Sequence, residues 1–234
     1  PHQHYVTVHT HPVAKNRREV LTPLIGDPNL DGLSIQIDHY ENTNEETQYW
    51  QDKSAAAGKP WLITIDENGP WWRGLDHDDR EPYNNQDSLR AFMLWGNLMA
   101  GGAGVEWYFG AKNPHNDLLC EDFRSRDRGW TWTNHAIRFF QDYLPFPEMS
   151  SHNELVTDGH FCFAKPGEVY AIYLPFGGEA TLDLSNQTGD FTTRWYDPRT
   201  GGEPQPGEQV TGGKVVEFRA RDAAGDWVIL VEKD

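Results

Sequence analysis

The chain has 234 residues, a length that fits one large domain or two of ordinary size. Its formal net charge of −16 argues against nucleic acid or an anionic membrane as a partner, whereas 10 Trp suit a carbohydrate partner because indole rings stack on the C–H faces of sugars. No apolar run is long enough to span a membrane, and the two widely separated cysteines, Cys120 and Cys162, exclude a disulfide framework.

Short β-type runs alternate with helical patterns in the first part of the chain. Thr43 stands where it can cap one of the helices, with Glu46 at the capping-box distance. Strands that alternate with helices indicate βαβ units and a parallel sheet. We therefore predict strands over residues 5–10, 33–38, 61–67 and 105–110, and helices over 42–57, 88–100 and 130–144.

The run at 61–67 is the most informative stretch of the chain. It is apolar from Trp61 to Ile65 and ends in two consecutive carboxylates, Asp66 and Glu67. A carboxylate at the carboxyl end of a buried parallel strand is where a barrel enzyme places its catalytic groups. A helix or loop cap beside core tryptophans is the alternative. Neighbouring residues of a strand point to opposite faces, and we favour Glu67 over Asp66 as the reactive group.

Four parallel strands that each end in polar or aromatic residues make half of a (β/α)8 barrel. We predict that residues 1–149 form the second half of such a TIM barrel, with about four βα units, and that the missing half lies upstream. An open half barrel would expose sheet edges and inner-face apolar residues. We therefore expect the isolated chain either to pair with its missing half or to form a homo-oligomer.

From about residue 150 the pattern changes to β-type runs separated by glycine-containing turns. Gly177-Gly178 and Gly201-Gly202 are typical of hairpins, and no helix start follows them. Strands at this spacing indicate an antiparallel β-sandwich, so the second domain covers residues 150–234. Its predicted strands are 159–164, 169–174, 180–184, 191–196, 214–219 and 227–232.

Motifs in both parts resemble a known family. Those of the first part resemble the second half of apiosidase-like (β/α)8 glycoside hydrolases: Val6-Thr7-Val8-His9-Thr10-His11-Pro12, Ile63-Thr64-Ile65-Asp66-Glu67-Asn68-Gly69 and Gly102-Ala103-Gly104-Val105-Glu106-Trp107-Tyr108. The tail is similar to the β-sandwich labelled "putative collagen-binding domain" behind such barrels in bacteria, through Val169–Leu174, Trp195-Tyr196-Asp197-Pro198-Arg199 and Trp227-Val228-Ile229-Leu230. The resemblance favours a secreted or periplasmic protein.

The resemblance implies a retaining hydrolase of a poly- or oligosaccharide. In that group the nucleophile ends the seventh strand, which corresponds to Glu67, and the acid/base ends the fourth strand, which would lie before Pro1. Retaining hydrolysis needs two carboxyl groups about 5–5.5 Å apart. We therefore expect this chain alone to be inactive, and we expect no cofactor.

Other strand ends supply candidates for substrate binding. His9 and His11 lie at the end of the first run and could bind a sugar hydroxyl or a metal. Two histidines without a third ligand make a weak metal signal, so we predict no metal site and favour sugar binding or a structural hydrogen bond. Asp38 and His39 are evenly balanced between substrate contact and a loop cap. Asn68, directly after Glu67, is a further candidate for substrate binding. Glu106 is expected inside the last strand, in a structural role or as the second carboxylate.

Aromatic and charged residues of two loops complete the candidate set. A sugar platform is predicted from the aromatic residues after two strands, Trp71, Trp72, Trp107 and Tyr108. Arg73 could hold the carboxylate of an acidic sugar, although an ion pair with Asp76 or Asp78 is favoured. The oxygen-rich stretch from Asp76 through Glu81 to Asp87 lacks the EF-hand spacing, and a solvated loop is favoured over Ca²⁺.

Two functions of different classes remain open. The first is a retaining glycoside hydrolase with Glu67 as its nucleophile, which requires an acid/base from an upstream half. The second is a non-catalytic protein that binds carbohydrate or a fibrous matrix through the β-sandwich and the Trp-rich barrel rim. Binding that survives Glu67→Gln would favour the second.

Overall fold

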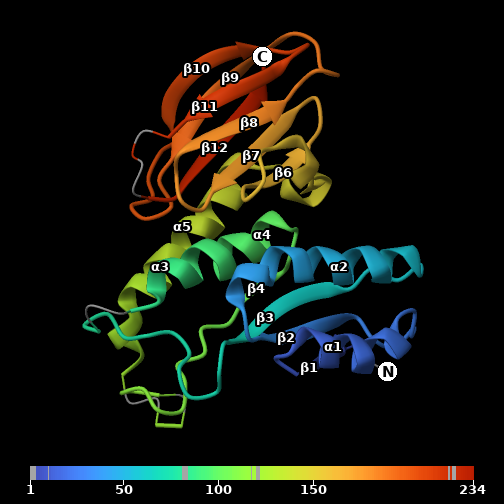
Figure 1. Ribbon diagram of the computed structural model, residues 1–234, viewed down its shortest axis with the longest axis vertical. Coiled ribbons are helices and arrows are strands. Elements are labelled where there is room, and N and C mark those ends of the chain that lie inside the picture. The colour runs from blue at the N-terminus through green and yellow to red at the C-terminus, as the bar shows by residue number, and fades with distance from the viewer. Residues whose placement is uncertain are drawn as a thin grey trace. The chain divides into compact units, whose positions relative to one another are not determined.

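The structure is a computed structural model that describes residues 4–9, 11–80, 84–116, 118–119, 122–220, 222 and 225–234 (Figure 1). Thr10, Glu81 and Cys120, named above, lie outside the described residues. The chain divides into two compact units, Pro1–Leu98 with Gly102–Trp130, and Met99–Gly101 with Thr131–Asp234. This division falls inside the helix α5, which covers Asp127–Tyr143 and was predicted over 130–144.

The first unit contains a four-stranded parallel sheet in the order β1-β2-β3-β4. Its strands are β1 (Thr7–His9), β2 (Gly32–Ile37), β3 (Leu62–Asn68) and β4 (Gly104–Val105). All four predicted strands of this part are present, and every neighbouring pair is parallel. The fourth is far shorter than the predicted 105–110, because only Gly104 and Val105 pair with β3.

Helices connect these strands, as the alternation predicted. They are α1 (Ala14–Leu21), α2 (Thr43–Ala56) and a third segment that begins as α3 (Gln86–Ser88), continues as the π-helical η3 (Leu89–Trp95) and ends as α4 (Gly96–Met99). Helix α1 was not predicted, because Lys15, Arg17 and Arg18 hide any apolar rhythm. Short 3₁₀ turns lie at Thr22–Leu24, Tyr40–Asn42, Phe123–Arg126, Phe146–Glu148 and Asn153–Leu155.

The predicted capping box of α2 is wrong. Thr43 is the first helical residue, and its hydroxyl donates to the Tyr40 carbonyl oxygen at 2.7 Å. Glu46 forms ion pairs with Arg17 and Arg18 instead of reaching back to the helix start. The buried guanidinium of Arg17 competes for the carboxylate more strongly than a backbone N–H does.

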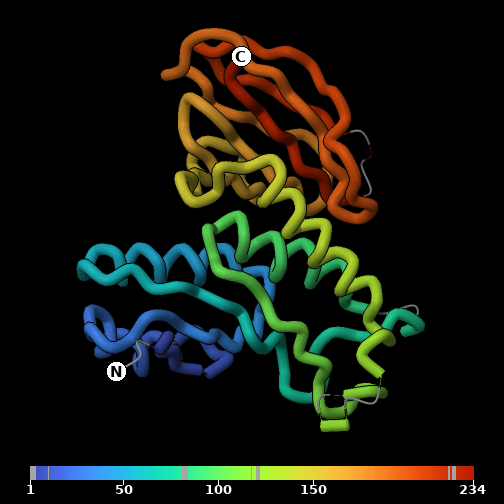
Figure 2. Tube along the Cα trace, turned by 180° about the vertical axis from the view of Figure 1, so that it is seen from behind, coloured from blue at the N-terminus to red at the C-terminus, as the bar shows by residue number. Residues whose placement is uncertain are grey.

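One face of the parallel sheet forms the core of this unit. Every second residue of β2, and of β3 as far as Ile65, is apolar and fully buried, and α2 packs against β3 while η3 packs against β4. Figure 2 traces the four strands and their helices from behind. The buried side chains of this face are Leu33, Ile35, Ile37, Ile63 and Ile65.

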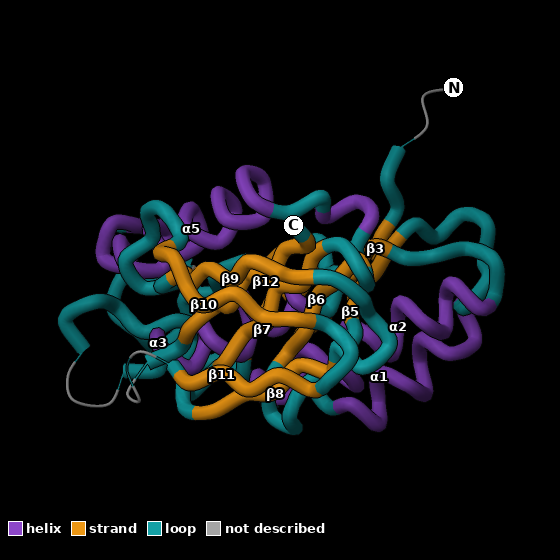
Figure 3. The backbone as a smooth tube through the Cα atoms, turned by 90° about the horizontal axis from the view of Figure 1, so that it is seen from above, coloured by secondary structure: helices purple, strands orange, loops and turns teal. Residues whose placement is uncertain are grey.

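The second unit contains two antiparallel sheets around one core (Figure 3). Six strands pair in the order β10-β9-β12-β7-β6-β5, and β11 pairs with β8. Apolar side chains from both sheets form a single cluster that includes Tyr170, Leu182 and Ile229. The strands are β5 (Ser150–Ser151), β6 (Phe161–Lys165), β7 (Val169–Leu174), β8 (Glu179–Asp183), β9 (Asp190–Tyr196), β10 (Gln205–Thr211), β11 (Val215–Arg219) and β12 (Trp227–Lys233).

The six strands predicted for this part are all present. Two strands were missed. Strand β5 has only two residues, and Pro206 and Gly207 interrupt the pattern of β10, whose residues are mostly exposed. In the described part of the chain, no helix combines the length and the apolar character that crossing a membrane requires.

Candidate active site at the carboxyl ends of the parallel strands

A β-bulge at Asp66 decides where Glu67 lies. Ile35 pairs with Ile65, but the next pair in the ladder is Gln36 with Glu67, so Asp66 is an extra residue in β3. Without the bulge, alternation would place Glu67 on the same face as Ile65, beneath the helices. The bulge returns Glu67 to the opposite face, and bulges of this kind are common beside active sites.

This opposite face of the sheet is lined by polar side chains. In the ladder, His9 pairs with Ser34 and Ser34 with Thr64, so the three side chains form one row across the sheet. Gln36 and Glu67 form the next row toward the carboxyl ends of the strands. We call these five residues the polar face.

His9 lies next to the carboxylate of Glu67. Its Nε2 is 3.5 Å from Glu67 Oε2, and its Nδ1 is 3.0 Å from Ser34 Oγ. About a fifth of the Glu67 side chain and half of His9 are exposed. A contact at each ring nitrogen fixes the orientation of an imidazole, so Ser34 aims His9 at the carboxylate. Two predicted site residues, His9 and Glu67, are therefore neighbours.

Glu106 directly follows the short strand β4. Its backbone N–H donates to the Ile65 carbonyl oxygen at 2.8 Å, and the residue is exposed. The expectation that Glu106 lies inside a strand is wrong, because β4 ends at Val105. Beyond it, the chain bonds to the loop that follows β3: Leu75 N–H donates to the Tyr108 carbonyl oxygen at 2.6 Å.

The loops after β3 and β4 are interlocked by two glycines. Gly74 (φ +57°) and Gly110 (φ +78°) have backbone conformations that favour glycine. A Cβ on Gly74 would overlap the Tyr108 carbonyl oxygen, and a Cβ on Gly110 would overlap that of Arg73. The two backbones therefore approach more closely than any other residue would permit.

Two exposed tryptophans lie on these interlocked loops. Trp71 and Trp72 are 54 % and 47 % exposed, with their rings edge to face at 5.7 Å. The Tyr108 hydroxyl donates to the Trp71 carbonyl oxygen, and Lys112 Nζ lies 5.2 Å from the centre of the Trp71 ring. Trp107, by contrast, is only 5 % exposed, so its ring packs inside this unit.

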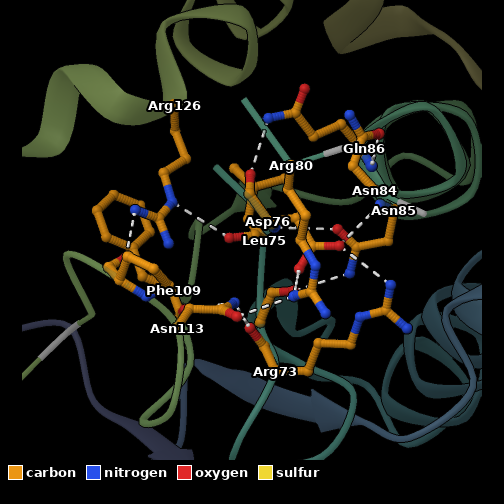
Figure 4. Close-up of polar contacts among 12 residues, drawn as sticks. Arg73, Leu75, Asp76, Arg80, Asn84, Asn85, Gln86, Phe109, Asn113 and Arg126 are labelled. Carbon is orange, nitrogen blue, oxygen red and sulfur yellow. Dashed lines mark hydrogen bonds and ion pairs between the residues drawn. The ribbon is translucent and has the colours of Figure 1, made fainter. Parts of the chain in front are cut away.

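A buried carboxylate braces the same loops (Figure 4). Asp76 is fully buried and pairs with Arg73 at 3.0 Å and Arg80 at 2.5 Å, and it accepts from the Asn85 N–H at 3.0 Å. The predicted preference of Arg73 for an ion pair is confirmed. Arg80 also donates to Asn113 Oδ1 at 3.0 Å, which joins the loop after β3 to the loop after β4.

The oxygen-rich stretch after Asp76 is also held by arginines. Asp78 lies 3.6 Å from Arg128 and accepts from Gln86 Nε2 at 2.7 Å, and Asp87 pairs with Arg90 at 2.5 Å. In the ranges that the structure describes, no three His, Cys, Asp or Glu side chains gather closely enough to hold a metal ion.

The remaining predicted site residues lie around the strand ends. His11 and His39 are exposed; His11 Nδ1 accepts from the Val13 N–H at 3.3 Å, and the Asp38 carboxylate accepts from the His39 N–H at 3.1 Å. Asn68 is only 2 % exposed, and in the part of the chain described here its Oδ1 has no hydrogen-bond partner.

Sequence reasoning missed Ser34 and Gln36. Their signal was present in the stretch from Gly32 to Ile37, in which every second residue is apolar and the residues between are small or polar. That alternation places Ser34 and Gln36 on one face of the sheet, opposite Leu33 and Ile35.

Comparisons with known proteins identify both parts at the level of fold. Residues 149–232 match the family described as "Putative collagen-binding domain of a collagenase". No protein of curated function matches the sequence. A solved structure described as "Glycoside hydrolase" has a TM-score of 0.71 at 15 % identity, over 99 % of this chain and 58 % of that chain.

A second solved structure, a glycoside hydrolase family 5 protein from Bacteroides vulgatus, has a TM-score of 0.67 at 19 % identity, over 98 % of this chain and 55 % of that chain. At these identities the likeness concerns the fold. The chain thus has a mixed α/β structure that resembles glycoside hydrolases, carries a collagen-binding-like domain, and spans a little over half the length of these two proteins.

Proposed function

We propose that this chain is the carboxyl-terminal part of a retaining glycoside hydrolase that acts on a poly- or oligosaccharide, with Glu67 as its nucleophile. The bulge at Asp66 carries the proposal, because it brings Glu67 beside His9 on the polar face. Barrel enzymes place their chemistry at this edge of a parallel sheet. The parallel sheet is then the second half of a (β/α)8 barrel, and residues 150–234 form an accessory β-sandwich.

In this proposal the Glu67 carboxylate attacks the anomeric carbon and forms a glycosyl ester, while the glycosidic C–O bond breaks and the acid/base protonates the leaving oxygen. Water, deprotonated by the same acid/base, then hydrolyses the ester and frees the Glu67 carboxylate. His9 is a positioning residue that holds the carboxylate from one side. Trp71 and Trp72 offer ring faces beside the strand ends to a sugar chain.

The acid/base must be a second carboxyl group about 5–5.5 Å from Glu67. We place it in an upstream half of the barrel, and Glu106 is the alternative within this chain because it follows β4 and is exposed. Structural neighbours longer than this chain support the upstream half. Without the second carboxyl group, this chain alone does not hydrolyse glycosides.

We also propose that the parallel sheet has a partner, either the missing half of the barrel or a second copy of this chain. Tyr5, next to β1, and Leu62 in β3 are 52 % and 55 % exposed, so these side chains near the polar face are not covered by the residues that the structure describes. The missing half, or a second copy, would cover them. Light scattering of the isolated chain should therefore show a dimer; a monomer that stays in solution would count against this partner.

Covalent trapping tests the nucleophile. The native protein that contains this sequence should be treated with an activated 2-deoxy-2-fluoro glycoside, which leaves a stable ester on the nucleophile. We expect the label on the peptide that contains Glu67, and we expect Glu67→Gln to abolish both labelling and hydrolysis. Asp66→Asn, one residue away, is the matched control and should keep both. A label on another carboxylate, or inversion of the anomeric configuration, would refute the assignment.

A second candidate function is non-catalytic binding of carbohydrate or of a fibrous matrix. It is favoured by the exposed Trp71 and Trp72 and by the family match of residues 149–232. Binding by the native protein that survives Glu67→Gln, without hydrolysis of any glycoside by the wild type, would select this function.

A further inference from the structure

Three side chains of the second unit form a hydrogen-bonded chain at the edge of its larger sheet. Ser150 Oγ lies 3.1 Å from His152 Nε2, and His152 Nδ1 lies 2.8 Å from Glu154 Oε1. In a serine hydrolase, the nucleophile, the base and the orienting carboxylate are joined by the same two contacts in the same order. None of the three residues belongs to the polar face.

The backbone explains why these side chains meet. Ser150 lies in β5 and pairs with Ala164 of β6, and the side chain of His152, two residues further on, points to the same face of the sheet. His152 precedes the 3₁₀ turn Asn153–Leu155, which brings Glu154 to the other ring nitrogen. One strand end and one turn are therefore enough to assemble the chain.

The backbone of His152 is held on both sides. Its N–H donates to the Cys162 carbonyl oxygen at 2.8 Å, and its carbonyl oxygen accepts from the Leu155 N–H at 3.0 Å. Asn153 Oδ1 accepts from the Cys162 N–H at 2.9 Å, which ties the turn to β6. The fold therefore positions the imidazole, and the ion pair with the exposed Glu154 adds little to stability.

The carboxylate decides which ring nitrogen carries the proton. An ionised carboxylate can only accept, so His152 Nδ1 is the donor in its contact with Glu154. In the neutral imidazole Nε2 is then an acceptor, and the Ser150 hydroxyl donates to it. His152 is thus in the tautomer that can remove the Ser150 proton, and the exposed Oγ of Ser150 can reach a substrate.

A backbone N–H beside the serine offers a donor to a developing oxyanion. His152 and Cys162 form a hydrogen-bonded pair of the ladder, so Ser151 is in a non-hydrogen-bonded position opposite Phe163. Its N–H therefore points away from β6. Strand β5 is the last strand of the six-stranded sheet (Figure 3), so this N–H is directed outward from the sheet edge. A donor placed in this way stabilises negative charge on a carbonyl oxygen.

We propose that Ser150, His152 and Glu154 form a catalytic site that hydrolyses carboxylic esters with short acyl groups. The proposal goes beyond the glycosidase function, because Glu67 takes no part in it. Ser150 Oγ attacks the ester carbonyl carbon while its proton passes to His152 Nε2. The C–O bond to the alcohol then breaks, and the alcohol leaves with that proton. Water, deprotonated by His152, hydrolyses the acyl ester, and the proton returns to Ser150 Oγ.

Hydrolysis of p-nitrophenyl acetate by the full chain tests the proposal, together with labelling by a fluorophosphonate probe. We expect turnover, and a phosphonyl group on the peptide that contains Ser150. Ser150→Ala should abolish the label, and Ser150→Ala and His152→Gln should each lower kcat/KM at least tenfold. Because the two residues act as a unit, the double variant should lose no more than either single variant. Glu154 is a positioning residue, so Glu154→Gln should lower kcat and leave KM unchanged.

Ser185→Ala is the matched control, because Ser185 is an exposed serine of the same unit, in the turn beside Asp183. It should keep both the label and the turnover. Turnover by Ser150→Ala equal to that of the wild type, a phosphonyl group on another residue in place of Ser150, or a wild type with neither turnover nor label would overturn the proposal. No glycoside is used, so this result is independent of trapping at Glu67.

Discussion

Replacing Glu46 by Gln should destabilise the first unit severely. The guanidinium of Arg17 is 1 % exposed and lies 3.2 Å from the Glu46 carboxylate, which is itself 5 % exposed. Arg17 also donates to backbone carbonyl oxygens of Pro12 and Gln36, next to the carboxyl ends of β1 and β2. The ion pair therefore ties α2 to the strand ends beside His9.

The expected loss follows from this burial. Removing one partner of a buried ion pair leaves a charge without compensation and costs about 3–5 kcal/mol. Arg18 also binds Glu46, at 2.6 Å, but its side chain is 37 % exposed and it adds little. Because domains are stable by only about 5–15 kcal/mol, Glu46→Gln should bring this unit close to unfolding under mild conditions.

Urea unfolding followed by circular dichroism measures the change, with the transition of each unit fitted separately. Glu45→Gln is the matched control: Glu45 is exposed on the same helix, and its replacement should change the free energy of unfolding by less than about 0.5 kcal/mol. Replacing both partners by apolar residues, as in Arg17→Met/Glu46→Leu, should recover much of the loss. A Glu46→Gln variant as stable as the Glu45→Gln control would refute the reasoning.

Three further predictions concern single residues. Burial raises the pKa of the Cys162 thiol, so iodoacetamide should label it only after unfolding, as peptide mass spectrometry would show; labelling in native buffer would contradict this. Gly110→Ala should lower stability by about 1–3 kcal/mol in thermal unfolding, more than Gly69→Ala, because both glycines have positive φ but only Gly110 also meets backbone. A hydrogen bond to Glu203 raises the pKa of Tyr143 to about 12, so its contribution to stability is present below pH 10 and is lost as pH rises toward 12; Tyr143→Phe should flatten this dependence, and an unchanged profile would contradict it.

Much of the fold was predictable because its core follows simple periodicities. The apolar residues of β2 alternate with small or polar ones, and the apolar run of β3 begins directly after the turn residues Gly58 and Pro60. These signals are local, so they can be recognised in the sequence without knowledge of the tertiary structure. The same holds for the second unit, where alternation and turn residues gave six of its strands.

The predictions failed where long-range contacts override local pattern. The stretch after Val105 is rich in aromatic residues and favours a strand, yet its backbone bonds to the loop after β3 through Leu75 and Trp71. Helix α1 lacks an apolar stripe because one of its two buried residues, Arg17, is charged. No local rule reveals that an arginine is buried, since the partner that permits it, Glu46, is far away in sequence.

The position of Glu67 shows how a departure from the local pattern can matter for chemistry. Strict alternation in β3 assigns Glu67 to the face of Ile63 and Ile65, where a carboxylate would be buried among apolar side chains at a large cost. The extra residue Asp66 removes that conflict, because it moves Glu67 to the face that carries His9. One strand thus supplies apolar side chains to the core and, within two residues, a carboxylate to the opposite face. A variant that lacks Asp66 should restore the alternation, bury Glu67 beneath the helices and separate it from His9, so the bulge is as necessary to this candidate site as the carboxylate.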